Sequence, residues 1–295
     1  MGQRLSAFLV ETPVDSHESE PHPSCKRPSL AKPRGAFFAC LVALLFVHVV
    51  ASPGHATSCE ASSAVRSVSP SPQAAPQAIV IGFMGGFVAH DETHHPEVQM
   101  MQALRREYSK DIYFGLFENR KVDEANELIL ARLGAKEDGR LSEDEKRHAC
   151  ILLFGHSWGA LAVLTLARQL AREGIPVMLT VQVDSVAKPF QNDWVIPPNV
   201  LQAVNFYQTH GLIHGRSRIK AADPSRTMIL GNFQWEYAKE PEECRDFSWY
   251  ARYFTKSHIE IECDPKVWSQ VRTLLRSSLP APLVTQAESA GQVPD

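Results

Sequence analysis

Short apolar runs alternate with helical segments along residues 78–278, and this alternation restricts the fold more than any other feature of the chain. Runs rich in Val, Ile, Leu and Phe predict strands, and segments with apolar residues at helical spacing predict helices between them. The predicted strands cover 78–83, 111–117, 149–155, 176–184, 200–208 and 226–233, and the predicted helices cover 96–108, 124–134, 158–174 and 264–278. Because such strands are apolar throughout, both faces of their sheet must be covered. We therefore expect an α/β fold, with a mostly parallel sheet between two layers of helices.

The residues before this domain predict a targeting segment. Residues 1–35 read as a basic, disordered N-terminal region, and residues 36–51 (AFFACLVALLFVHVVA) as an apolar run without formal charge. A positive flank before such a run is typical of a signal peptide or signal anchor, which places the rest of the chain outside the cytoplasm and allows membrane anchoring through 36–51. A buried core helix is the alternative. Residues 52–77, rich in Ser, Pro and Ala, predict a flexible linker, and residues 279–295 a frayed tail.

Charge and cysteine content add two expectations. The net charge is −3, with acidic and basic residues interspersed, which argues against a nucleic-acid-binding surface. In an oxidising compartment Cys244 and Cys263 are candidates for a disulfide, although the sequence alone does not give the connectivity.

The segment Gly155-His156-Ser157-Trp158-Gly159 follows a predicted strand and opens a predicted helix. In that context the pattern G-x-S-x-G indicates a serine on a very tight turn, with its hydroxyl exposed and the helix N-terminus beside it. Gly155 and Gly159 leave room for backbone that a Cβ would strike. We therefore expect Ser157 to be a nucleophile. The alternative is a serine that only caps the helix.

With this motif, residues 78–278 resemble the α/β-hydrolase superfamily, and its lipase- and esterase-like members in particular. The resemblance implies a serine, an acid and a histidine in that chain order. It also implies an oxyanion hole that is built partly from the loop after an earlier strand. Neither a metal nor an organic cofactor is expected for this chemistry.

Two downstream residues fit the implied order. Asp184 ends the strand that follows the motif and is the expected acid, with Asp193 and Asp223 as alternatives. His258 comes shortly before the last predicted helix, whose expected N-cap is Asp264. An imidazole is able to take the serine proton and return it at neutral pH, so His258 is the expected base. His210 and His214, after the strand 200–208, are the alternatives.

The oxyanion hole is expected at the backbone N–H of Trp158 and at a second N–H from the loop Gly82-Phe83-Met84-Gly85-Gly86. The family often shows His-Gly at the start of this loop, whereas this chain has Gly82-Phe83. The choice of Phe83 or Met84 therefore rests on position alone.

Residues 90–97 (HDETHHPE) have the composition of a metal site. Adjacent histidines do not easily face one ion, and the spacing matches no established site. We expect a solvated loop bordering the cleft, and no metal.

These expectations combine into an extracytoplasmic serine hydrolase that cleaves an acyl bond, most readily a carboxylic ester, in a small-molecule or lipid-like substrate. An acyltransferase, thioesterase or peptidase on the same fold is an alternative, as is a non-catalytic binding protein. Residues 209–225 or 234–257 are candidates for a cap over the cleft, and the aromatic residues of the second segment are candidates for its apolar wall. These aromatic residues are Trp235, Trp249, Tyr250 and Tyr253.

Overall fold

The computed structural model describes residues 78–108, 110–135 and 140–282. The predicted N-terminal region 1–35, the targeting segment 36–51 and the linker 52–77 lie outside these residues, as does most of the predicted tail 279–295. Among the helices of the described part, none has both the length and the apolar character needed to cross a bilayer.

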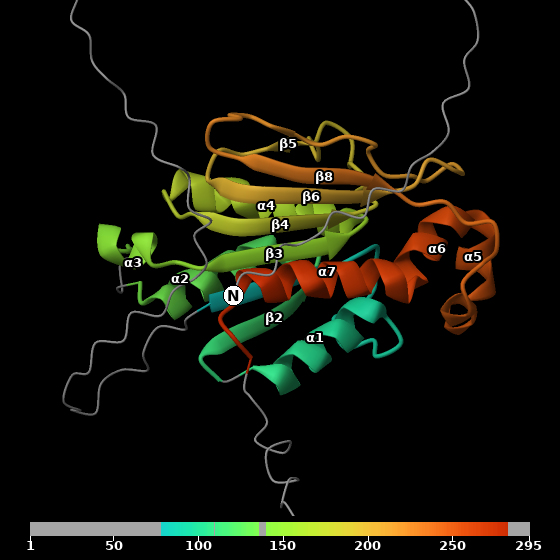
Figure 1. The fold of residues 1–295 in the computed structure, drawn as a ribbon, viewed down its shortest axis with the longest axis horizontal. Helices are drawn as coiled ribbons and strands as arrows, with labels where there is room; N and C mark the ends of the chain where they lie inside the picture. Colours follow the sequence, from blue (N-terminus) through green and yellow to red (C-terminus); the bar gives the residue numbers. More distant parts are fainter. Residues whose placement is uncertain (1–77, 109, 136–139, 283–295) are drawn as a thin grey trace, which may run out of the picture. The chain divides into compact units, whose positions relative to one another are not determined.

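The centre of the domain is a parallel sheet of six strands in the order β2-β1-β3-β4-β6-β8 (Figure 1). The strands are β1 (Ala78–Met84), β2 (Ile112–Glu118), β3 (Ile151–His156), β4 (Val177–Val183), β6 (Val200–Tyr207) and β8 (Met228–Gln234). Every neighbouring pair runs parallel, so all six carboxyl ends lie at one edge of the sheet. Two further short strands, β5 (Val195–Ile196) and β7 (Lys220–Ala221), form a separate parallel pair.

Helices cover both faces of this sheet, which confirms the predicted α/β class. One face packs against α1 (Pro96–Glu107) and α7 (Pro265–Ser278). The other face packs against α2 (Val122–Leu133) and α4 (Trp158–Arg172). Alternate residues of β1 enter the two cores, since Val80 belongs to the first and Ile79 and Ile81 to the second. This alternation explains why the strands are apolar at nearly every position.

The six predicted strands and four predicted helices are all present, with ends within two residues of those expected. The capping residue Asp264 is also confirmed, because its carboxylate accepts a hydrogen bond of 2.8 Å from the N–H of Lys266.

The segment between β8 and α7 contains structure that the sequence patterns did not predict. It forms a 3₁₀ helix, η1 (Glu242–Asp246), and two short helices, α5 (Trp249–Phe254) and α6 (Lys256–Cys263). A fourth short helix, α3 (Glu143–Arg147), precedes β3. The strand arrows point toward α5 and α6 (Figure 1). A disulfide between Cys244 and Cys263 joins η1 to the end of α6, with the two Cα atoms 5.2 Å apart.

Candidate active site

Ser157 occupies the turn between β3 and α4. Its backbone has φ 56° and ψ −123°, a strained combination for a residue with a side chain. The N–H of Ser157 donates to the carbonyl of Val183 at 2.9 Å, which holds the turn against β4. The serine hydroxyl makes no capping bond to α4. The alternative in which Ser157 serves only as a helix cap is therefore wrong.

Two glycines make this turn sterically possible. A Cβ at Gly155 would lie 2.5 Å from the backbone of Gly159, and a Cβ at Gly159 would lie 2.8 Å from the carbonyl oxygen of Met84. Both clashes involve backbone atoms, which do not move aside easily. The glycines thus allow the first turn of α4 to pack directly on the ends of β1 and β3.

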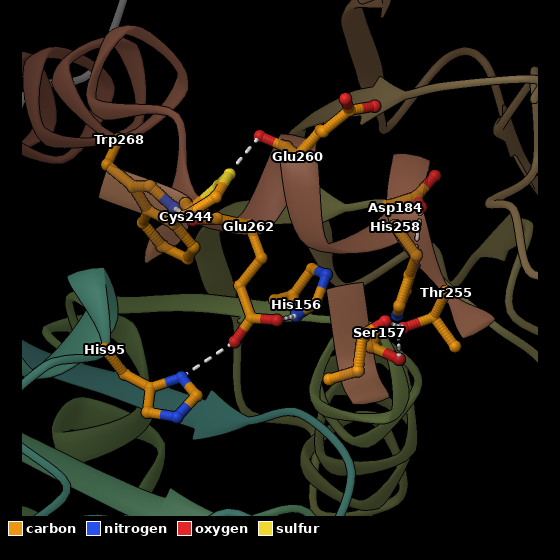
Figure 2. Close-up of polar contacts among 12 residues, drawn as sticks. His95, His156, Ser157, Asp184, Cys244, Thr255, His258, Glu260, Glu262 and Trp268 are labelled. Carbon is orange, nitrogen blue, oxygen red and sulfur yellow. Dashed lines mark hydrogen bonds and ion pairs between the residues drawn. A yellow bond between two sulfur atoms is a disulfide. The ribbon is translucent and has the colours of Figure 1, made fainter. Parts of the chain in front are cut away.

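The structure brings Ser157, His258 and Asp184 together in one line of contacts (Figure 2). Nε2 of His258 lies 2.8 Å from Oγ of Ser157, and Nδ1 of His258 lies 2.6 Å from Oδ2 of Asp184. All three residues are buried, with exposed fractions of 6% for Ser157, 7% for His258 and 0% for Asp184. The hydroxyl, the imidazole and the carboxylate are therefore within proton-transfer and orienting distance of one another.

Asp184 is itself held by neighbours that sequence reasoning did not single out. Gln208 donates from Nε2 to Oδ2 at 2.9 Å, and its backbone N–H donates to Oδ1 at 3.2 Å. The N–H of Gly215 donates to Oδ1 at 2.7 Å. These donors fix the position of the carboxylate behind His258. The position of Gln208 directly after β6 was the available signal, since residues at that edge of a parallel sheet meet.

The alternative acids and bases lie in other surroundings. Asp193 is buried and accepts from Ser185 and Arg216. Asp223 accepts from the N–H and the hydroxyl of Ser225. The other two candidates, His210 and His214, are exposed.

The predicted oxyanion donors lie around Ser157. Trp158 is the first residue of α4, where backbone N–H groups have no partner within the helix. Met84 ends β1, whereas Phe83 lies one residue earlier and is paired with both β2 and β3. A Cβ at Gly85 would lie 3.3 Å from Cβ of Ser157, so the backbone just after Met84 is beside the nucleophile.

The carboxyl end of β2 fixes the loop that follows this backbone. Asn119 donates from Nδ2 to the carbonyl of Gly86 at 2.5 Å and accepts from Nζ of Lys188 at 3.2 Å. Nζ of Lys188 also lies 4.9 Å from the centre of the Trp158 ring. The loop after β1 is thus tied to β2 and to the segment after β4, on opposite sides of β1.

A second group of polar side chains lies beside these residues and is called here the buried His–Glu cluster. It consists of His95 and Glu97 at the start of α1, His156 at the end of β3, and Glu262 in α6 (Figure 2 labels all but Glu97). Their exposed fractions are 5%, 0%, 1% and 4%. The expectation of a solvated loop holds for 90–94 but is wrong for His95 and Glu97, because Glu262 and Phe247 from distant segments pack over them.

Burial dominates the electrostatics of this cluster. It raises the pKa of the Glu97 and Glu262 carboxyls, and at Glu97 repulsion from Glu262 raises the pKa further. Burial lowers the pKa of the His95 imidazole, and it holds the pKa of His156 well below the ordinary value. The ring of His156 lies against that of His258, with 4.5 Å between their centres.

Large apolar side chains are exposed on the segments that follow the strands. Trp249, Tyr250, Tyr253 and Phe254 of α5 are between 59% and 76% exposed, and Trp235 packs on the core instead. Of the four aromatic residues considered for the wall of a cap, three therefore point to solvent. Other large apolar side chains in segments that follow strands are also exposed, most fully those of Phe87, Phe190 and Leu212.

The parallel sheet with helices on both faces, and the strained serine between β3 and α4, define an α/β-hydrolase fold. The fold suggested by the G-x-S-x-G resemblance is therefore confirmed.

No protein-family model matches the chain, and no curated protein matches it significantly. Among solved structures it is similar to RedJ with a PEG molecule bound in the active site, at 12% identity and a TM-score of 0.37, over 75% of this chain and 98% of that one. It is also similar to the RedJ thioesterase of the prodiginine biosynthetic pathway in Streptomyces coelicolor, at 13% identity and a TM-score of 0.36, over 74% and 97%. A third structure, ClbQ from the colibactin NRPS/PKS pathway, has 10% identity and a TM-score of 0.30, over 68% and 98%. The identities and TM-scores are low, so the α/β-hydrolase fold is assigned from the parallel sheet and the turn at Ser157.

Proposed function

We propose that this protein is a serine hydrolase that cleaves acyl bonds through Ser157, His258 and Asp184. The observation that carries the proposal is the unbroken line of short contacts from the Ser157 hydroxyl through His258 to Asp184. Asp184 and His258 are 74 positions apart in the sequence, and Ser157 and His258 are 101 positions apart. The fold itself therefore brings the three residues together. A serine on a strained turn, a base in contact with it and a carboxylate behind the base are the parts that nucleophilic acyl transfer requires.

In the proposed reaction, Oγ of Ser157 attacks the substrate carbonyl carbon while Nε2 of His258 takes the hydroxyl proton. The carbonyl oxygen becomes an oxyanion, which the N–H of Trp158 and a second N–H at Phe83 or Met84 stabilise. Gly85 also lies beside Ser157, so the segment that is a candidate for the second donor extends to this residue. His258 then gives its proton to the leaving group, and an acyl-enzyme remains on Ser157. Water, deprotonated by His258, releases the acid and restores the serine. Asp184 holds the imidazole and stabilises its charged form.

A carboxylic ester of apolar character is the proposed substrate. The exposed side chains of Phe87, Phe190 and Leu212, and those of α5, give the segments after the strands an apolar surface that suits a lipid-like acyl group. A thioester, an amide or transfer to another acceptor would use the same residues. Product analysis with and without an added alcohol or amine distinguishes hydrolysis from transfer.

We also propose that the domain works outside the cytoplasm. The apolar run 36–51 behind a basic flank supports this location. The disulfide between Cys244 and Cys263 supports it independently, since disulfides persist in oxidising compartments. Fractionation of cells that express the full chain tests the proposal, and recovery of the protein only in the reducing cytoplasm would contradict it.

The catalytic proposal is tested with a fluorophosphonate probe and a series of nitrophenyl esters of increasing acyl length. We expect the probe to label the wild-type protein and not the Ser157→Ala variant, and ester hydrolysis to be lost in the same variant. A known serine esterase serves as the positive control. If the probe labels the control enzyme but not the folded wild-type protein, the proposal that Ser157 is a catalytic nucleophile is wrong.

A further inference from the structure

Next to Ser157 and His258, the buried His–Glu cluster gathers nitrogen and oxygen atoms from segments far apart in the chain. One ligand atom from each of His95, Glu97 and Glu262 lie within 4.8 Å of one another. Nδ1 of His95 is 2.8 Å from Oε1 of Glu262, and Nδ1 of His156 is 3.6 Å from Oε2 of the same carboxyl (Figure 2). The start of α1, the end of β3 and α6 thus converge on one point in the interior.

In the part of the chain that the structure describes, two of these side chains have buried polar atoms without a hydrogen bond. Within the described residues, both carboxyl oxygens of Glu97 and both ring nitrogens of His156 have no hydrogen-bond partner. Burying such groups without partners costs free energy, and burying two carboxyls together adds their mutual repulsion. A positive ion among them would offset both costs.

We propose that the buried His–Glu cluster binds one divalent metal ion, and that zinc is the ion that fits it best. Imidazole nitrogen and carboxylate oxygen are both good zinc ligands, and bonds of about 2.0–2.2 Å in a tetrahedron place the ligand atoms roughly 3.3–3.6 Å apart. The spacing of 4.8 Å or less among the ligand atoms of His95, Glu97 and Glu262 reaches this value through small side-chain rotations. His95, Glu97 and Glu262 supply three ligands. His156, whose Nδ1 is 3.6 Å from Oε2 of Glu262, supplies the fourth after its side chain turns toward the other two.

The charge of this ligand set suits its position. Two carboxylates and two neutral imidazoles around a dication have no net charge, so the bound ion would not repel the imidazolium that forms at His258. Glu97 also lies in the first turn of α1, where its charge compensates the positive end of the helix.

The ion would act as a clamp and not as a participant in the acyl reaction. Glu262 lies one helical turn after His258 on α6, and His156 directly precedes Ser157. The indole N–H of Trp268 donates to the carbonyl of Glu262 at 2.5 Å and anchors the same turn from α7. A metal shared by α1, β3 and α6 would therefore fix the two segments that carry the serine and the histidine.

Zinc binding is measured on the purified chain after removal of metals with a chelator, by titration calorimetry with a zinc salt and by thermal unfolding with and without zinc. The variants are His95→Gln and Glu97→Gln. The matched control is His94→Gln, since His94 is adjacent to His95 but exposed. Ser157→Ala is included because zinc binding does not depend on hydrolysis, so failure of the catalytic proposal would not affect this result.

We expect one zinc per chain for the wild type, Ser157→Ala and His94→Gln, with a rise of several degrees in Tm on zinc addition. His95→Gln and Glu97→Gln should bind at least tenfold more weakly. The proposal is overturned if the wild type does not bind zinc, or if these two variants bind as tightly as the wild type. If the two variants fail to fold, cobalt is added to the metal-free wild-type protein in place of zinc. Absence of the visible absorption of tetrahedral cobalt then overturns the proposal equally.

Discussion

The side-chain amide of Gln208 donates to Oδ2 of Asp184, the carboxylate oxygen that also contacts Nδ1 of His258. One oxygen therefore meets a donor from the residue that directly follows β6 and the imidazole from α6. The same amide nitrogen also donates to the carbonyl of Ile213 at 3.0 Å, so the position of Asp184 depends on the loop after β6.

Replacing Gln208 with Ala should lower the turnover number and leave KM nearly unchanged. A hydrogen bond to a charged group contributes about 1.5–3 kcal/mol, so we expect turnover to fall roughly tenfold to a hundredfold. Steady-state kinetics on the best ester measures both constants. Thr209→Ala, at the next and exposed position, is the control. An equal loss in the control variant, or a change in KM alone, would show that Gln208 does not act through Asp184.

Replacing Asp184 with Asn should preserve the fold but remove most of the activity. The amide fits the same space, yet it no longer holds the imidazole in the required tautomer, and turnover should fall roughly 10³–10⁴-fold. Circular dichroism checks the fold, and kinetics checks the turnover. Asp223→Asn is the comparison, because that carboxylate bonds Ser225 instead. Near-normal activity in Asp184→Asn would assign the role of the acid to another residue.

Removing the disulfide by replacing both Cys244 and Cys263 with Ser should destabilise the protein. The cross-link spans 19 residues, and closing a loop of that size stabilises a fold by about 3 kcal/mol. Because Cys263 ends α6, we expect lower turnover at temperatures well below unfolding as well. Urea denaturation compares the free energies of unfolding. If the variant and the wild type unfold at the same urea concentration, the cross-link does not stabilise the domain.

Glu118 should stabilise the protein near neutral pH and not in acid. Burial raises the pKa of its carboxyl, but hydrogen bonds from His90 and Lys121 outweigh this effect and hold the pKa at about 2. The folded pKa lies below the ordinary value of 4.5, so the stabilisation is complete above the ordinary value and is lost as the pH falls from there toward the folded pKa.

We therefore expect Glu118→Gln to lower the free energy of unfolding by about 1–3 kcal/mol at neutral pH. The difference in the free energy of unfolding between the variant and the wild type should shrink steadily as the pH is lowered from 4.5 toward about 2. Urea unfolding over a pH series measures it, with Glu127→Gln on the exposed side of α2 as the control. A difference that stays constant with pH would mean that the charge of Glu118 is not its source.

Local patterns predicted the elements of the sheet and the turn at Ser157 because each depends on nearby residues, whereas Asp184 and His258 were predicted from the chain order that the resemblance implies. Strands buried on both faces are apolar throughout, and the acid and the base follow the turn in the order that the resemblance implies. The short helices α5 and α6 lack such a pattern. His258 was expected before the last helix, and the structure places it within an additional helix, α6.

The buried His–Glu cluster shows why the remainder could not be predicted. Residues 90–97 are polar, and a polar stretch before a helix predicts a solvated loop. His95 is buried because distant segments return to contact it, among them Phe247 and Glu262, the latter 167 positions later. Contacts at such separations leave no periodic signal in either segment. The same reason applies to Gly215, whose N–H bonds Asp184 across 31 positions.

The order of the segments along the chain has a consequence for how the protein is made. Ser157 and its turn are synthesised before β4, β6 and β8, whereas α6 and α7 come after all six strands of the sheet. Helix α7 covers one face of the sheet together with α1, and α6 carries the proton acceptor. During synthesis, which proceeds from the N-terminus, that face closes only after His258 has emerged. A nascent chain interrupted after β8 would retain the serine but lack His258, the histidine that contacts its hydroxyl, so hydrolytic competence would arise only as the fold is completed.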